Sequence, residues 1–182
     1  MLNKALVFVN ETGIEMLTAR NLASALNIST APIYSIFSSL QELKDEVMRM
    51  GINLLIQYTS NNSCENEMLN IGIGYIRFSR DYSKLYRSMF LSGNNYKELA
   101  DEFDQIVLEK FKANPWTANY TPEEINMTME QMRYIISGMA ALISNQLVPP
   151  PSDEEIVAKI SKTALSMARC IQFEKELLKN EA

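Results

Sequence analysis

A short stretch of the chain, residues 29–37, concentrates side chains that can contact the edges of nucleic-acid bases. When a helix enters the major groove of DNA, small and hydroxylated side chains approach base edges and the thymine methyl group. We expect Ile33 and Phe37, which are four residues apart, to anchor such a helix on the core. Its exposed side and first turn then carry Thr30, Ala31, Pro32, Tyr34 and Ser35.

Catalytic chemistry has little support in the composition. The chain contains no His, which removes the commonest general base and the commonest metal ligand. It also lacks a Walker-type Gly-Lys-Ser/Thr loop and a Gly-x-Ser-x-Gly motif. Cys64 and Cys170 are too few and too widely separated for a disulfide framework or a zinc site. We therefore expect no catalytic site, no metal and no cofactor; an enzyme would have to rely on carboxylates, Lys and Tyr.

The bulk properties favour a cytoplasmic protein that has no membrane partner. No apolar run approaches the roughly 20 residues that a membrane span requires, and residues 1–13 lack the cleavage site of a signal peptide. Two cysteines suit a reducing compartment. The net charge of −5 argues against an indiscriminate nucleic-acid binder, but it allows a sequence-specific protein with a small contact face.

The periodicity of apolar residues predicts an all-α fold of about nine helices. Sustained period-two alternation, the pattern of a strand, is absent. Gly13 is expected to end the first helix, and Thr18, Ser29, Ser39, Thr121 and Ser152 are expected N-caps. The predicted helices cover residues 2–12, 19–26, 30–37, 40–58, 66–80, 82–91, 95–113, 122–147 and 153 to near the end.

Two short helices joined by a tight turn behind a longer first helix are the layout of a helix-turn-helix module. Asn27 is expected to break the first of the pair, and Ile28 to fill the corner between them. The alternative interpretation is an ordinary helical hairpin inside a bundle. We assign residues 1–50 to a DNA-binding domain and residues 51–182 to a larger helical domain, and the polar stretch at 60–67 is a candidate boundary between a small N-terminal and a larger C-terminal domain.

The first 50 residues resemble the N-terminal domain of the tetracycline-repressor (TetR-like) family of bacterial transcription regulators. The resemblance depends on a set of spaced positions: Gly13, Leu17, Thr18, Leu22, Ala23, Leu26, Ser29, Ile33, Tyr34, Phe37, Ser39, Glu42 and Leu43. It implies a homodimeric, ligand-responsive regulator, more often a repressor, that binds a near-palindromic double-stranded DNA operator. It also implies a C-terminal domain that dimerises through its last two helices and holds an effector pocket.

The resemblance also implies individual roles for the residues of the module. Thr18, Ser29 and Tyr34 align with positions that hold phosphates, and Arg20 aligns with a position that reaches a base or a phosphate. The positions that align with base-contacting residues are Thr30, Ala31, Pro32 and Ser35.

Two departures from the family pattern affect the expected affinity for DNA. Ile36 stands where the family often has His, and Leu40 stands where it usually has Lys, so two phosphate partners are missing. Residues 1–50 hold four basic and five acidic side chains. We therefore expect weak nonspecific binding with a shallow salt dependence. The same deficit leaves open a TetR-like adaptor that binds a protein partner rather than DNA.

The last two predicted helices each carry an apolar stripe, which suits a two-fold four-helix interface between two chains as well as an ordinary core. The expected interface residues are Ile125, Met129, Ile136, Met139, Ile143, Ile156, Ile160, Ala164, Met167 and Ile171.

Aromatic and methionine side chains of the C-terminal part suit an adaptable pocket for an apolar or aromatic effector, although a plain core is the alternative. The expected pocket residues are Tyr75, Phe78, Tyr82, Tyr86, Met89, Phe103, Met132 and Tyr134. Arg77, Arg80 and Arg133 would either balance an acidic ligand or lie on a solvated face.

Overall fold

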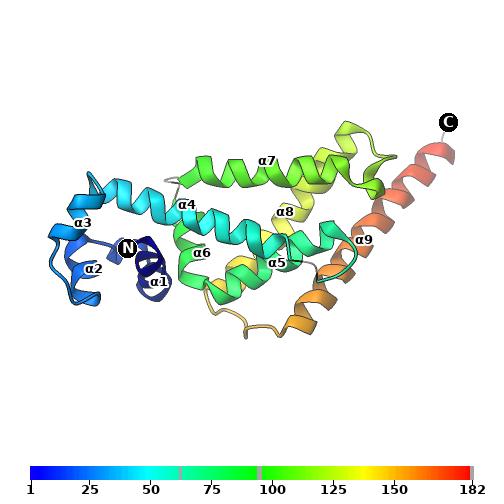
Figure 1. Cartoon of the computed structure of the whole chain (residues 1–182). Coiled ribbons are helices and arrows are strands. Elements are labelled where there is room, and N and C mark those ends of the chain that lie inside the picture. Colours follow the sequence, from blue (N-terminus) through cyan, green and yellow to red (C-terminus); the bar gives the residue numbers. More distant parts are fainter. Residues whose placement is uncertain (62, 94–95, 181–182) are drawn as a thin grey trace.

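The computed structural model describes residues 1–61, 63–93 and 96–180, and within these ranges it contains nine α-helices, two short 3₁₀ helices and no strand (Figure 1). The predicted all-α architecture is confirmed. The elements are α1 (Leu2–Thr12), η1 (Ile14–Met16), α2 (Ala19–Ala25), α3 (Ala31–Ile36), α4 (Leu40–Thr59), α5 (Glu67–Asp81), α6 (Ser83–Phe90), α7 (Lys97–Ala113), η3 (Pro115–Thr117), α8 (Pro122–Ser144) and α9 (Asp153–Asn180).

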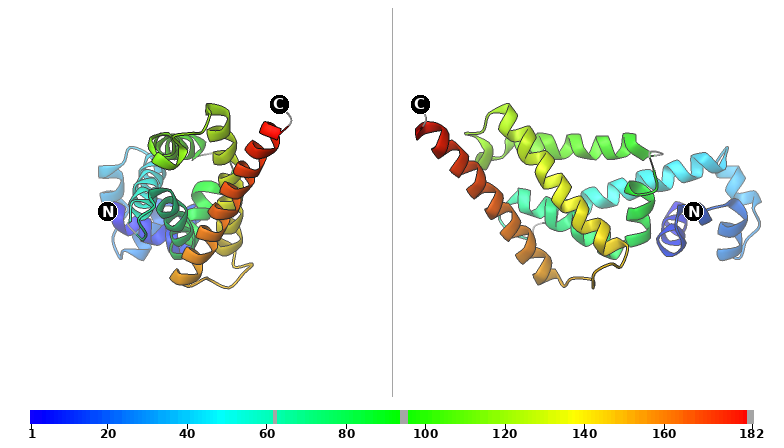
Figure 2. Two further views of the ribbon diagram at one scale, coloured as in Figure 1. Left: turned by 90° about the vertical axis from the view of Figure 1, so that its right-hand side faces the viewer. Right: turned by 180° about the vertical axis from the view of Figure 1, so that it is seen from behind.

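The molecule is elongated, with α1, α2 and α3 grouped at one end and the C-terminal part of α9 at the other (Figures 1 and 2). Helix α4 runs from the first group into the larger helical part, and it packs on α5 as well as on α1. It is continuous across residue 50, where we placed the domain boundary. Buried side chains from both parts belong to one hydrophobic core. Among the described residues, no helix is both long enough and apolar enough to cross a membrane.

Most helix ends form as the sequence predicts. Thr18 Oγ1 accepts a hydrogen bond from the backbone N–H of Asn21 at 3.1 Å, and Ser39 Oγ accepts one from Glu42 at 3.0 Å. Thr121 and Glu124 form a reciprocal capping box at the start of α8. These side chains satisfy backbone donors that have no partner inside the helix, which fixes where each helix begins.

Two predicted boundaries are wrong. Thr30, not Ser29, is the N-cap of α3, because Asn27 takes a left-handed conformation (φ 53°) and the turn is one residue longer. Ile28 does not fill the corner, since its side chain is exposed while its N–H bonds to the carbonyl of Ala23. At the other end of the chain, α8 stops at Ser144 rather than at residue 147.

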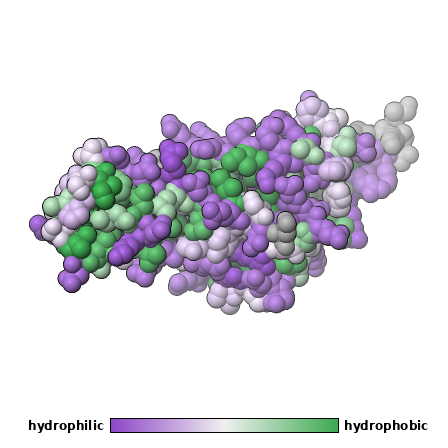
Figure 3. Space-filling model, viewed as in Figure 1, coloured by the Kyte–Doolittle hydropathy of each residue, from purple (hydrophilic) through white to green (hydrophobic). Residues whose placement is uncertain are grey.

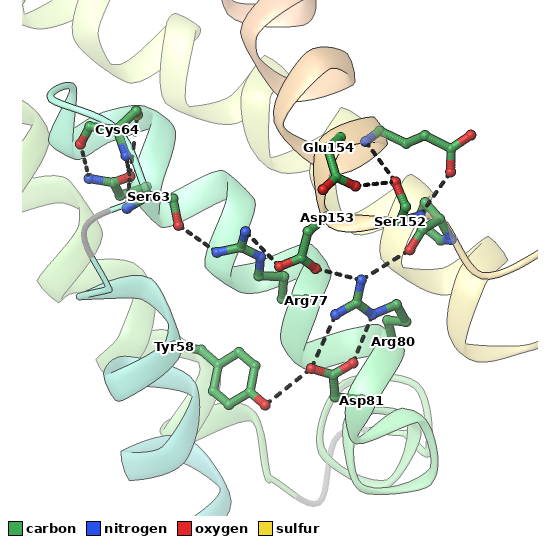
Figure 4. A network of polar contacts seen from close by, with 12 residues as sticks. Tyr58, Ser63, Cys64, Arg77, Arg80, Asp81, Ser152, Asp153 and Glu154 are labelled. Atoms are coloured by element: carbon green, nitrogen blue, oxygen red, sulfur yellow. Dashed lines mark hydrogen bonds and ion pairs between the residues drawn. The ribbon is translucent and has the colours of Figure 1, made fainter.

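Two arginines of α5 fix the start of α9 through ion pairs with Asp153 (Figure 4). Arg77 Nη2 lies 2.9 Å from one carboxylate oxygen, and Arg80 Nη1 lies 2.8 Å from the other. Arg80 also pairs with Asp81, which accepts a hydrogen bond from the Tyr58 hydroxyl of α4 at 3.2 Å. The pKa of the Asp153 carboxyl is lowered, first by the hydrogen bond from Arg80 and then by the charge of Arg77. The network joins α4, α5 and α9, so neither arginine is on an unpaired solvated face.

Candidate nucleic-acid interface and ligand cavity

Helix α3 is held against the core by one side and leaves the other side in solvent. Ile33 and Phe37 are 2% and 4% exposed, and both belong to the hydrophobic core. Two further residues of the helix, Tyr34 and Ile36, are 57% and 56% exposed. In Figure 3, hydrophobic side chains reach the surface at the end of the molecule that carries α2 and α3. Ile33 lies within α3, whereas Phe37 is the extended residue that directly follows the helix, so the two anchors hold α3 at its middle and at its C-terminal end.

The expected DNA-contacting residues lie together on the α2–α3 end of the molecule, and most of them are exposed. Thr18 is half-buried because its hydroxyl caps α2. The Ser35 hydroxyl donates to the carbonyl of Pro32 at 2.9 Å, which leaves it free only as an acceptor. The remaining expected contacts are exposed residues: Arg20, Ser29, Thr30, Ala31, Pro32 and Tyr34.

No Asp, Glu, Lys or Arg occurs between residues 27 and 41, so α3 and both of its flanking turns carry no formal charge. The next residue, Glu42, is held at the start of α4 by two donors of Ser38, the backbone N–H at 2.6 Å and the hydroxyl at 2.5 Å. These hydrogen bonds lower the pKa of Glu42, the side-chain bond being the largest contribution. Glu42 therefore stabilises the turn between α3 and α4 by accepting both hydrogen bonds from Ser38.

A cavity of about 440 Å³ lies in the C-terminal part, between α5, α6, α7, α8 and α9. Five of the eight expected pocket residues line it: Tyr75, Tyr86, Phe103, Met132 and Tyr134. The other three lie elsewhere. Phe78 and Tyr82 stack on each other at 5.5 Å between ring centroids, and Met89 packs toward α4. Aromatic composition alone could not separate these two groups, because a stacked core and a cavity wall use the same side chains.

Among its described residues, the cavity presents no unpaired formal charge, because its tyrosine hydroxyls are neutral and its two charged residues pair with each other. The Tyr75 and Tyr86 hydroxyls lie 3.4 Å apart, and burial raises the pKa of both. Asp104 and Arg133, the two formally charged residues of the lining, form an ion pair with each other at 2.7 Å. The rest of the wall is mainly apolar, so the cavity suits a neutral, largely apolar molecule. Trp116, the single Trp of the chain, also lines it.

The apolar stripes expected to form a dimer interface point into the protomer. Five of the ten residues are buried in the core, namely Ile136, Ile143, Ile156, Ile160 and Ile171. The cavity wall includes Met129, Ile136, Ala164, Met167 and Ile171. Ile125 and Met139 are half-buried.

Other hydrophobic residues of α8 and α9 are exposed instead. On α8 these are Met127, Tyr134, Ile135 and Leu142, and on α9 they are Leu165 and Phe173. The rear view in Figure 2 shows both helices uncovered on one side of the molecule. Periodicity tells which residues share a helix face but not what that face contacts, so it could not indicate that five of the expected interface residues lie in the core of the protomer.

Helix α6 connects the cavity to the N-terminal helices, a feature for which the sequence gives no signal. Tyr86 and Phe90 line the cavity on one side of α6. On another side, Met89 packs against Gly51 of α4. Ser88 Oγ accepts a hydrogen bond from the backbone N–H of Ile14 at 3.1 Å, in the segment that follows α1. A displacement of α6 would therefore change its contacts with α4 and with the segment that follows α1.

Within the described part of the chain, no group of three or more Cys, Asp or Glu side chains is placed to hold a metal ion. No protein-family model matches the chain, and no curated protein sequence is significantly similar to it. The functional interpretation therefore depends on the geometry described above and on the resemblance of the first 50 residues.

Proposed function

We propose that the chain is a TetR-like, ligand-responsive transcription regulator that binds operator DNA as a homodimer and acts as a repressor. The observation that carries the proposal is the exposure of one whole side of α3. A helix that is anchored only by Ile33 and Phe37 keeps its other side available for the major groove. The hydroxyl groups and the small side chains on that side suit contacts with phosphates and base edges.

A homodimer is supported by the exposed hydrophobic residues of α8 and α9. Several large exposed apolar side chains on two neighbouring helices in the chain are typical of a surface that binds another protein. A two-fold pair that buries Leu142 and Leu165 would also place two copies of α3 on one assembly. Paired helices about 34 Å apart reach successive major grooves on one side of the duplex.

The response to a ligand is supported by the position of α6. A molecule that enters the cavity would contact Tyr86 and Phe90, while Met89 of the same helix packs against Gly51 of α4. A ligand that prefers one position of α6 would thereby bias the orientation of α4 and the spacing of the two α3 helices. Release of an operator requires that this preference amount to several kcal/mol.

One observation favours the protein-binding adaptor as a second candidate. Tyr34 and Ile36 are both more than half exposed, and residues 1–50 carry one more acidic side chain than basic. A pull-down from cell extract after nuclease treatment separates the two candidates. A partner protein that is retained without nucleic acid favours the adaptor, and loss of every partner on nuclease treatment counts against it.

A gel-shift experiment with the promoter region upstream of the chain's own coding sequence tests the proposal. We expect a salt-sensitive complex for the wild type that is weakened in Thr30→Ala and Tyr34→Ala. Thr163→Ala, which removes a hydroxyl bonded within α9, is the matched control and should bind as the wild type does. Absence of a salt-sensitive preference for any promoter fragment would refute the proposal.

A further inference from the structure

The exposed side of α3 lacks every side chain that usually distinguishes one base from another by paired hydrogen bonds. Guanine is read by Arg or Lys, adenine by Asn or Gln, and cytosine by Asp or Glu. Between Ile28 and Leu40 the chain contains none of these six residue types. What the segment offers instead is apolar surface and hydroxyl groups.

Apolar side chains of the segment are exposed to solvent. Tyr34 and Ile36 are 57% and 56% exposed, and Ala31 and Pro32 are also exposed. Thr30 adds a methyl group beside its hydroxyl. In the major groove, the C5 methyl group of thymine is the only methyl group that an unmodified base pair presents.

Two of the hydroxyl groups of the segment are already engaged in hydrogen bonds within the protein. The Ser35 hydroxyl donates its hydrogen bond to the carbonyl of Pro32 at 2.9 Å, and the Ser38 hydroxyl donates to Glu42. A hydroxyl bonds to any base edge, so it discriminates less than a paired contact does. Methyl contacts are therefore the discriminating feature that α3 can offer.

The charge distribution permits close approach to DNA although the chain carries a net charge of −5. Residues 27–41 contain no carboxylate that would repel phosphates, and the nearest preceding formal charge in the sequence is the exposed cation Arg20 on α2. The acidic residues that give the chain its charge lie outside this segment. The segment itself therefore adds no electrostatic repulsion when α3 approaches the phosphates of double-stranded DNA.

We propose that α3 recognises its operator mainly through the 5-methyl groups of thymines in each half-site. This inference rests on the proposed function, since it specifies what the DNA contact reads. It predicts half-sites in which the base pairs that face α3 are predominantly A·T. Their sequence would be read by contact of thymine methyl groups with the exposed side chains of Thr30, Ala31, Tyr34 and Ile36.

The test uses a duplex that the full-length protein retains from a random-sequence DNA library. The retained duplex is resynthesised with deoxyuridine in place of thymidine, which removes the methyl groups and leaves the base pairing unchanged. We expect affinity to fall by about fourfold for each methyl in contact, the value for burial of one such group. Uracil placed only outside the half-sites should have no effect. Equal affinity for the thymine and uracil duplexes would overturn the inference.

Variants of α3 identify the side chains that read the methyl groups. Thr30→Ser removes only a methyl group, and Ile36→Ser removes an exposed apolar side chain; both should bring the thymine-to-uracil affinity ratio closer to one. Val7→Ser on α1 is the matched control, since Val7 is exposed to the same 56% as Ile36, and it should leave the ratio unchanged. A ratio that stays at the wild-type value in both α3 variants would overturn the assignment to α3.

The failure of this inference can be told apart from the failure of the proposed function. If a duplex is retained but the uracil duplex binds as tightly as the thymine duplex, the protein recognises DNA by contacts other than thymine methyl groups. In that case only the inference fails. If no duplex is retained from the library, both fail.

Discussion

Gly74 of α5 lies directly against the backbone carbonyl group of Tyr58 near the end of α4. A Cβ atom at position 74 would overlap this carbonyl group and also crowd the Cα atom of Thr59. Backbone atoms cannot rotate away as a side chain can, so the close approach of the two helices depends on glycine at this position. It fixes where α4 enters the larger helical part of the molecule.

Gly74→Ala should therefore destabilise the protein by about 3 kcal/mol, at the upper end of the usual cost of overpacking. Gly72→Ala in the same helix is the matched control. Its Cβ would meet side-chain atoms and no backbone, namely the branch methyl Cγ2 of Ile160 at 3.1 Å and the terminal Cδ1 of Ile136 at 3.2 Å, and each would have to move by only a few tenths of an ångström. The gain in helix propensity then offsets the cost, and stability should stay within about 1 kcal/mol of the wild type. Urea unfolding of both variants measures the difference, and equal losses would contradict the account.

Asp153 should stabilise the protein at neutral pH and lose this effect in acid. Its pKa is lowered from 3.8 by Arg80 and Arg77, so the contribution is present above that value and disappears as the pH falls through the lowered pKa. Because the Asp153 side chain is 50% exposed, solvent screening limits the contribution to about 1 kcal/mol or less. The difference in unfolding free energy between the wild type and Asp153→Asn should shrink between about pH 7 and about pH 3.

A control for the acid experiment is Asp101→Asn. Asp101 pairs only with Lys97, at 3.7 Å on the surface of α7, and both side chains are more than half exposed. We expect its difference from the wild type to be near zero at every pH. A difference for Asp153→Asn that is equally small at neutral pH would show that the network at the start of α9 adds nothing to stability.

The cavity should bind a neutral apolar fluorophore such as N-phenyl-1-naphthylamine. Binding should increase the emission of the dye and shift the emission of Trp116, the single Trp, which lines the cavity. Ala164→Phe places a ring inside the cavity and should weaken binding by about tenfold or more, which corresponds to about 1.4 kcal/mol. Ala113→Phe, at an exposed position of α7, is the control. Equal binding to both variants would place the dye elsewhere on the protein.

Leu142→Glu on α8 and Leu165→Glu on α9 should convert a homodimer into a monomer. Both side chains are nearly half exposed in the protomer, so a carboxylate at either position should have little effect on folding. In a dimer interface, however, the carboxylate would lose its water without gaining a partner, which costs free energy of association. Sedimentation velocity at several protein concentrations measures the association. Val7→Glu on α1 is the control and should remain dimeric. A wild type that sediments as a monomer at every concentration would refute the dimer itself.

Local structure was predictable where one residue decides it. Thr18, Thr121 and Ser39 begin their helices as predicted, because a capping side chain acts on backbone groups only two or three residues away. Ser29 was the exception. The left-handed Asn27 lengthens the turn by one residue, and nothing in the residue types distinguishes Ser29 from Thr30 as a cap.

Long-range relationships were not predictable in the same way. The apolar face that includes Ile156 and Ile160 was found from its periodicity, but both core and interface are apolar, so its orientation could not be read. The ion pairs of Asp153 join residues more than 70 positions apart, and the sequence does not show which charged residues will pair over such a distance. The cavity depends on how five helices leave space between them, which composition does not determine.

The most direct test of DNA recognition by α3 is a ratio of two affinities measured by fluorescence anisotropy. The first is the affinity for the duplex that the protein retains from the library, and the second is the affinity for a scrambled duplex of equal length and composition. We predict that the wild type prefers the retained duplex by at least about a thousandfold, the lower end for specific DNA binding. Tyr34→Ala should reduce this ratio while the protein stays folded and dimeric. A wild-type ratio near one, or a ratio that Tyr34→Ala and Thr30→Ala leave unchanged, would contradict recognition of DNA by α3.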